Sequence, residues 1–188
     1  LRERPEVGAM LVRMAPTHVR FGSFQAFFAR RQPEYVKQLA DHVIARFYPH
    51  LAGAADTYPR FFDEVSVRTA QLIAKWQAVG WAHGVMNSDN MSIIGLTLDY
   101  GPFGFLDAYD PACICNHSDH HGRYSFRNQP DIGYFNLRCL GQALSSLVTP
   151  QQEQEALAAY EAAHAAHYLK LMRAKLGLQD AKPEDAAL

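Results

Sequence analysis

A polar segment near the middle of the chain carries residue types that suit phosphoryl chemistry. It reads HGVMNSDN over residues 83–90, and Asp99-Tyr100-Gly101 follows nine residues after Asn90. A carboxylate can orient or deprotonate an attacking hydroxyl. An amide oxygen and a second carboxylate can hold Mg²⁺, a hard cation that prefers oxygen ligands and can bridge phosphates. Asp89, Asn90 and Asp99 could therefore fill the roles found in kinase-type phosphotransferases.

The spacing of this segment leaves other interpretations open. In protein kinases the catalytic Asp comes two residues after the His, and the Asn follows five residues later. In this chain the residue two positions after His83 is Val85, not Asp. Small-molecule phosphotransferases usually carry Asp directly after His-Gly, and Val85 occupies that place as well. From the spacing alone, residues 87–90 fit a polar turn equally well.

The rest of the chain must position these residues, and helical periodicity dominates it. Apolar spacing and capping signals predict five helices, beginning near Ser23 and covering 33–48, 61–79, 134–147 and 150–176. Thr149 and Gln152 form a capping box for the last helix, and Gly177 ends it. Residues 7–14 are predicted to form a buried strand, and 91–94 and 95–98 to pair around a turn. The fold class is therefore mainly α with a small β element (α+β).

Composition limits the classes of partner. The 188 residues hold 18 Lys and Arg against 19 Asp and Glu, so the formal net charge is −1, which gives no general attraction to nucleic acid or anionic lipid. No apolar run approaches the roughly 18 residues of a membrane span. Three cysteines are too few for a disulfide framework, and they indicate reduced thiols in the cytoplasm. We expect no nucleic acid and no membrane among the partners.

Three longer stretches resemble one known family. They read GAMLVRMAPTHVRFGSFQAFFAR from Gly8, HGVMNSDNMSIIGLTLDYGPFGFLDAYDP from His83, and ICNHSDHHGRYSFRNQPDIGYFNL from Ile114. These stretches resemble the sequences of the selenoprotein O family, bacterial protein adenylyltransferases with a kinase-like fold. The resemblance implies an enzyme that transfers AMP from ATP to Ser, Thr or Tyr hydroxyls of proteins and releases pyrophosphate. UMP transfer is also attributed to bacterial members.

The resemblance also implies roles for five residues. Asp89 matches the family's catalytic proton acceptor. Asn90 and Asp99 match its Mg²⁺ or Mn²⁺ ligands, and Asp99 also lies beside the nucleotide phosphates. Arg13 and Arg20 match its nucleotide-binding arginines, and a guanidinium can grip phosphate oxygens with two parallel hydrogen bonds.

The domain organisation expected from the resemblance is incomplete. Residues 1–180 resemble the C-terminal lobe of a kinase-like fold, with a flexible tail over 181–188. We expect the N-terminal lobe to be absent, because no Gly-rich phosphate loop occurs, and the start at Leu1 suggests an internal fragment. No Cys-x-x-Cys or near-terminal Cys matches the family's redox-active position. Two alternatives to an active fragment therefore stay open, a non-catalytic nucleotide- or partner-binding domain and a small-molecule phosphotransferase.

Other clusters have simpler interpretations. His117, Asp119 and Arg123 are expected to brace the active-site loop by hydrogen bonds, although the nearby His and Cys residues also suit zinc in type. Asp107 and Asp110 are predicted to cap a turn before the following proline. Six aromatic residues are expected in the core and not on a base-stacking surface, namely Phe21, Phe24, Phe27, Phe28, Trp76 and Trp81.

Overall fold

Five α-helices make up most of the computed structural model, which describes residues 8–10, 12–178, 182 and 185. They are α1 (Phe21–Ala29), α2 (Pro33–Phe47), α3 (Thr57–Ala78), α4 (Gln129–Ala143) and α5 (Pro150–Leu176). Short 3₁₀ turns lie at η1 (Pro49–Leu51), η2 (Ser88–Asn90) and η3 (Phe126–Asn128), and two strands at β1 (Trp81–Ala82) and β2 (Gly104–Phe105). The predicted fold class, mainly α with a small β element, is confirmed.

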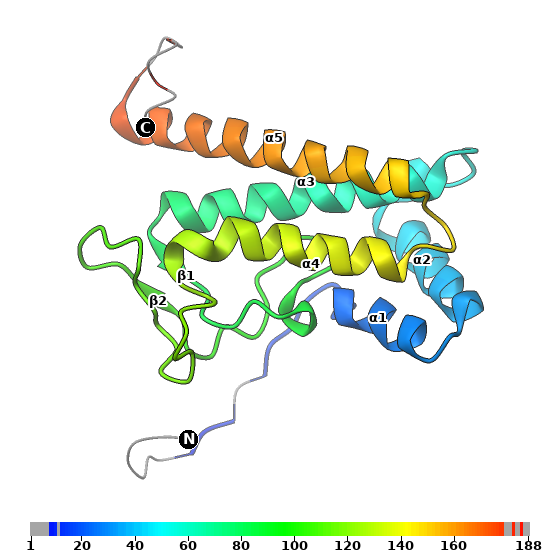
Figure 1. Ribbon diagram of the computed structural model, residues 1–188, viewed down its shortest axis with the longest axis horizontal. Helices are drawn as coiled ribbons and strands as arrows, with labels where there is room; N and C mark the ends of the chain where they lie inside the picture. The colour runs from blue at the N-terminus through cyan, green and yellow to red at the C-terminus, as the bar shows by residue number, and fades with distance from the viewer. Residues whose placement is uncertain (1–7, 11, 179–181, 183–184, 186–188) are drawn as a thin grey trace.

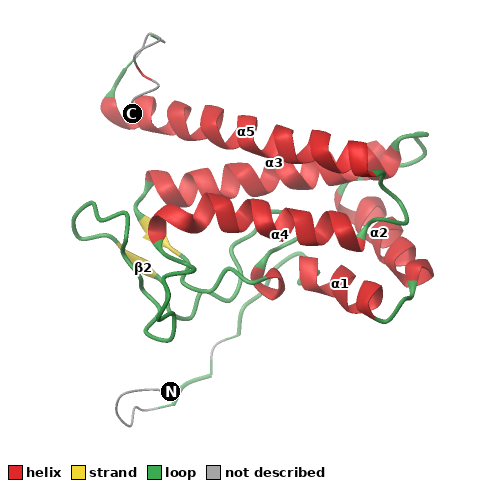
Figure 2. Cartoon of the chain, viewed as in Figure 1, coloured by secondary structure: helices red, strands yellow, loops and turns green. Residues whose placement is uncertain are grey.

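Helices α3, α4 and α5 pack against one another and run side by side (Figure 1). Helix α1 packs against α4, and α2 continues from α1 at one end of this layer. The long irregular stretch between β1 and α4 lies at the other end and beneath α4 (Figure 2). The helical layer thus forms a support on which a segment with little regular structure is held.

Helix α5 shows why local sequence signals succeeded for this element. The Thr149 hydroxyl accepts a hydrogen bond from the Gln152 backbone N–H, and Gln152 Oε1 accepts one from the Thr149 N–H. Pro150 stands in the first turn, where its missing N–H costs nothing. Gly177 ends the helix with a φ of 71°, a left-handed conformation that glycine adopts without strain. The predicted bounds are confirmed at both ends.

The core is aromatic and aliphatic, as predicted. Phe21, Phe24 and Leu137 are fully buried, and Trp76 and Trp81 nearly so. Burial of each such side chain contributes on the order of 1.5–3 kcal/mol to folding. Phe28 departs from the prediction, because 39% of it is exposed at the C-terminal end of α1.

Several helix boundaries differ from the sequence prediction. Helix α1 begins at Phe21 instead of near Ser23, whose hydroxyl accepts a hydrogen bond from the Arg20 N–H. Helix α3 begins at Thr57, four residues early, and α4 begins at Gln129, five residues early. In α4 the first turns bury polar Gln129 and small Gly133, so the apolar periodicity used for prediction is missing there.

The strand predicted over 7–14 is wrong for its described part. Residues 8–10 and 12–14 form no strand, and Met10, Val12 and Met14 are largely exposed. An apolar run becomes a strand only when it finds a hydrogen-bonding partner, and none pairs with these residues. Residues 7 and 11 lie outside the described part of the chain.

The β pairing also differs from the prediction. In place of two paired strands, residues 91–98 have one bridge within the stretch, between Met91 and Thr97, and one from Ser92 to Arg20. The ladder that forms joins β1 and β2 antiparallel, with Trp81 opposite Phe105, and the sequence did not predict it. Of the tail predicted over 181–188, Lys182 and Asp185 are described, and the rest lies outside the described residues.

No helix within residues 8–10, 12–178, 182 and 185 is both long enough and apolar enough to cross a membrane.

Candidate active site

The start of α1 is joined to the segment that follows Asn90. The backbone of Arg20 pairs antiparallel with Ser92. Phe21 N donates to the Met91 carbonyl over 3.0 Å, and Ile93 N donates to the Val19 carbonyl over 3.1 Å. These bonds hold the first turn of α1 beside the 3₁₀ turn η2, which contains Asp89 and Asn90.

Arg20 and Asp99, which are distant in sequence, form an ion pair in this region. Arg20 Nη2 lies 2.8 Å from Asp99 Oδ2, and the two side chains are 31% and 56% exposed. Asp99 has a φ of 50°, a left-handed backbone that Asp tolerates better than most residues. The structure therefore brings together the predicted nucleotide-binding Arg20 and the predicted metal ligand Asp99.

Arg13 reaches the same segment from the extended N-terminal stretch. Its guanidinium donates to the Thr97 carbonyl and lies 4.7 Å from the centre of the Tyr100 ring. It thus contacts residues on both sides of Asp99. Two arginines converge on residues 97–100, an arrangement that suits an anionic ligand such as a phosphate chain.

Asp89 and Asn90 differ in their surroundings. The Asp89 side chain is exposed and its carboxylate lies against Gly22 at the start of α1. Asn90 is buried, and its Nδ2 donates to the Val85 carbonyl over 2.8 Å. This bond leaves Oδ1 as the atom of Asn90 that suits a metal.

The donor atoms fit a magnesium or manganese ion. Asn90 offers an amide oxygen and Asp99 a carboxylate, and Mg²⁺ is usually bound by one or two such groups together with substrate phosphates and water. No group of three or more His, Cys, Asp or Glu that could hold a metal occurs in the described ranges.

Buried polar side chains from the helices hold the backbone of the irregular segment. Gln129 Oε1 accepts from His83 N over 2.9 Å, and its Nε2 donates to the Trp81 carbonyl over 3.0 Å. Asn136 Nδ2 donates to the Met86 carbonyl, and the Tyr48 hydroxyl donates to the Ile93 carbonyl. The sequence analysis did not predict these supporting residues. A polar side chain next to the apolar stripe of a helix, as at Asn136, would have indicated one of them.

His83 joins this segment to the backbone next to Asp99. It is fully buried, and its Nε2 donates to the Leu98 carbonyl over 2.7 Å. Burial lowers the pKa of His83, so the neutral ring is favoured. In that tautomer Nδ1 is an acceptor, and it receives the Val85 N–H over 3.3 Å. One side chain thereby fixes two backbone groups on either side of Asp89 and Asn90.

The loop that follows β2 is braced as expected for Asp119. Its two carboxylate oxygens accept from Arg123 N and Tyr124 N, over 2.9 and 2.7 Å. Asn116 Nδ2 donates to the Gly84 carbonyl, which ties this loop to residues 83–90. The Arg123 guanidinium instead lies 5.1 Å from the centre of the Phe135 ring.

Asp110 behaves as the sequence predicted. Its Oδ1 accepts a hydrogen bond from Ala112 N over 2.9 Å, which closes the turn around Pro111.

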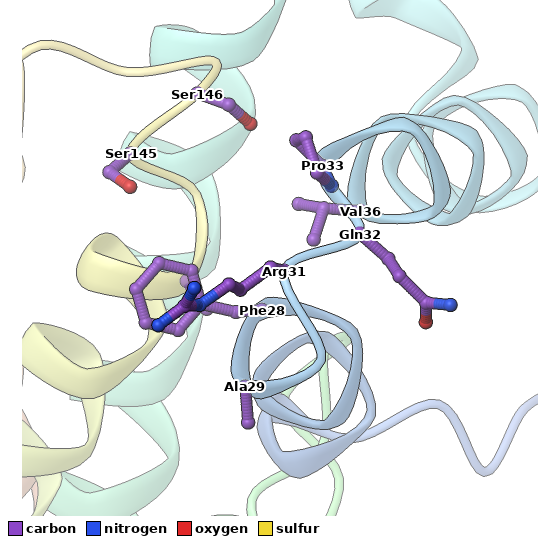
Figure 3. A pocket seen from close by; sticks show the side chains of 9 residues that line it. Phe28, Ala29, Arg31, Gln32, Pro33, Val36, Ser145 and Ser146 are labelled. Carbon is purple, nitrogen blue, oxygen red and sulfur yellow. The ribbon is translucent and has the colours of Figure 1, made fainter.

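A cavity of about 550 Å³ lies away from these residues. Its lining comes from the turn between α1 and α2 and from the end of α4, including Phe28, Arg31 and Ser145. Figure 3 shows Ser145 and Ser146 facing the α1–α2 turn across this space. None of the five candidate site residues lines it.

Comparison with known proteins gives one consistent family. The family model described as protein adenylyltransferase SelO matches residues 1–187. The chain is 60% identical over 187 residues to the "Protein nucleotidyltransferase YdiU" of Myxococcus xanthus (strain DK1622). It is 59% identical over 184 residues to the protein of the same name from Pectobacterium atrosepticum.

These alignments cover nearly all of this chain but a minor part of each relative. They take in 100% and 98% of the chain, and 38% of the Myxococcus and of the Pectobacterium protein. The chain thus spans about two fifths of the length of the curated relatives that it matches.

Proposed function

The chain belongs to the protein adenylyltransferase SelO family, and from this premise we propose that it carries the catalytic loop and metal ligands of a protein nucleotidyltransferase. The observation that carries the proposal is the convergence of Arg13 and Arg20 on residues 97–100, which include Asp99. This stretch follows Asp89 and Asn90 through the turn at 91–97. Cationic and oxygen-donor groups are thereby gathered at one surface, as a metal–nucleotide complex requires.

The proposed reaction is transfer of AMP from ATP to a Ser, Thr or Tyr hydroxyl of a protein. The hydroxyl oxygen forms a bond to the α-phosphorus, the bond from that phosphorus to the bridging oxygen breaks, and pyrophosphate leaves. Asp89 orients the hydroxyl and accepts its proton. Its exposed position lets a protein substrate approach from solvent.

The remaining residues position the nucleotide. Asn90 Oδ1 and Asp99 would hold Mg²⁺ or Mn²⁺, which when bound offsets negative charge on the phosphates. Arg20, which pairs with Asp99, and Arg13, which contacts Thr97 and Tyr100, would grip phosphate oxygens. Most of the rate enhancement then comes from orientation and electrostatics, because no covalent intermediate on the protein is needed.

Labelled nucleotides test this proposal. A full-length protein containing this chain is incubated with ATP labelled at the α or the γ position, with Mg²⁺ or Mn²⁺, and with casein as an acceptor rich in hydroxyls. Label from the α position on protein supports nucleotidyl transfer. Label from the γ position alone would instead indicate phosphotransfer. Absence of both transfer and nucleotide binding would indicate a non-catalytic domain, and UTP labelled at the α position measures the preference for AMP over UMP.

A further inference from the structure

Gly22 lies in the first turn of α1, where the backbone conformation does not require glycine. Its backbone does not adopt the positive φ that favours glycine over other residues. Inside a helix, glycine is less favourable than alanine because it loses more backbone freedom on folding. Some contact outside the helix must therefore explain the residue.

The contact is with Asp89. A Cβ placed on Gly22 would overlap Asp89 Oδ1 and would lie 3.0 Å from Asp89 Cγ and 3.4 Å from its Cα. The last distance is ordinary van der Waals contact, so the two backbones need not move apart. The overlap is with the carboxylate, which can swing aside because the Asp89 side chain is exposed.

The backbones on both sides of this contact are held in place. Phe21 N donates to the Met91 carbonyl over 3.0 Å, and Asn90 N donates to the Asn87 carbonyl over 2.9 Å. Asn90 Nδ2 adds the bond to Val85. A methyl group at position 22 would thus be relieved by rotation of the Asp89 side chain, and not by movement of α1.

We propose that Gly22 is a positioning residue for Asp89. Its lack of a side chain leaves the space in which the Asp89 carboxylate rests against the first turn of α1. The positive end of the α1 dipole lies at that turn and favours a carboxylate there. The inference rests on the proposed function, because it matters for catalysis only if Asp89 accepts the proton.

Two other glycines supply matched controls for a Gly22→Ala variant. At Gly133 in α4, a Cβ would overlap Ile73 Cδ1 and lie 2.5 Å from the Tyr160 hydroxyl oxygen, inside the helical core. At Gly8 nothing lies within 4 Å of the added Cβ. Gly133→Ala therefore tests overpacking away from the site, and Gly8→Ala tests the substitution itself.

The experiment measures kcat, KM for ATP, ATP binding and melting temperature of the three variants in a full-length protein. For Gly22→Ala we expect kcat to fall about 10- to 100-fold, the cost of misplacing a reacting group by about 1 Å. Its KM for ATP and its ATP affinity stay at the unsubstituted values. Its melting temperature stays at or above the unsubstituted value. Gly133→Ala lowers the melting temperature instead, and Gly8→Ala changes none of these quantities.

An Asp89→Asn variant separates the two levels of the proposal. If Asp89→Asn is inactive and Gly22→Ala keeps its full kcat, the inference about Gly22 is overturned while the proposed function stands. If Asp89→Asn keeps its activity, both are overturned. Equal residual rates for Asp89→Asn and for the double variant support the inference, because Gly22 then acts through Asp89 alone. A further loss in the double variant would contradict it.

Discussion

Arg20 Nη2 lies 2.8 Å from Asp99 Oδ2, so a cation already neighbours the carboxylate that we assign to the metal. Both residues are partly exposed, and solvent screens their interaction. The pair holds the start of α1 beside residues 97–100. A metal ion bound at Asp99 would compete with the guanidinium, which would then be available to a phosphate.

Removal of Arg20 is expected to have opposite effects on metal and nucleotide. In Arg20→Ala, Mn²⁺ affinity rises because Asp99 loses a competing positive charge. ATP affinity falls about 10- to 100-fold, the range for losing hydrogen bonds to a charged phosphate. Titration calorimetry with MnCl₂ alone and with ATP measures both. Arg31→Ala, at the α1–α2 turn, is the control, and a parallel loss of both affinities would contradict this prediction.

Removal of the Asp99 carboxylate is expected to abolish metal-dependent transfer. We expect Asp99→Ala in a full-length protein to give no protein labelling from α-labelled ATP, with Mg²⁺ or with Mn²⁺, because a ligand to the metal is lost. Asp107→Ala, another exposed aspartate in the same stretch, serves as control and retains labelling. Undiminished labelling by Asp99→Ala would refute the assignment.

Gln129 is predicted to be a strong determinant of stability. Gln129→Leu leaves the buried His83 N–H and Trp81 carbonyl without this partner. Each unsatisfied buried group costs about 1–3 kcal/mol, so the loss of two partners lowers the free energy of unfolding by about 2–6 kcal/mol. Urea unfolding measures it. The exposed Gln151→Leu change stays within about 0.5 kcal/mol, and a similar small effect at Gln129 would show that the two bonds contribute little.

Stability is predicted to fall as the pH falls below about 6.5, the ordinary pKa of His. Because burial lowers the pKa of folded His83, the unfolded chain binds a proton at a pH where the folded chain does not. The His83 contribution is complete above the unfolded pKa and declines with acidity below it. His164 and His167, whose pKa values are also lowered, add to the same trend.

A His83→Gln variant isolates the contribution of this ring. Urea unfolding of the original chain and of the variant is compared from pH 5 to 8. We expect the difference in unfolding free energy between the two to be constant above about pH 7 and to shrink toward pH 5. A difference that does not change with pH would show that His83 does not drive the acid loss.

The sequence predicted the parts of this protein that depend on nearby residues. The capping box at Thr149 and the stop at Gly177 set the bounds of α5, because their hydrogen bonds and φ preference are local. The apolar spacing over 33–48 located α2 for the same reason. The residue types over 83–99 predicted the candidate site, while their spacing alone fitted a polar turn equally well. The family was identified from the longer stretches at 8–30, 83–111 and 114–137.

Tertiary structure decided the contacts between segments that are distant in sequence. The Arg20–Asp99 pair, the Gly22–Asp89 contact and the support from Gln129 follow no local pattern, since each depends on how α1 and α4 pack against an irregular loop. The strand predicted over 7–14 was wrong for its described residues, because strand formation also depends on distant contacts. An apolar run forms a strand only when the fold supplies a partner, and residues 8–10 and 12–14 find none there.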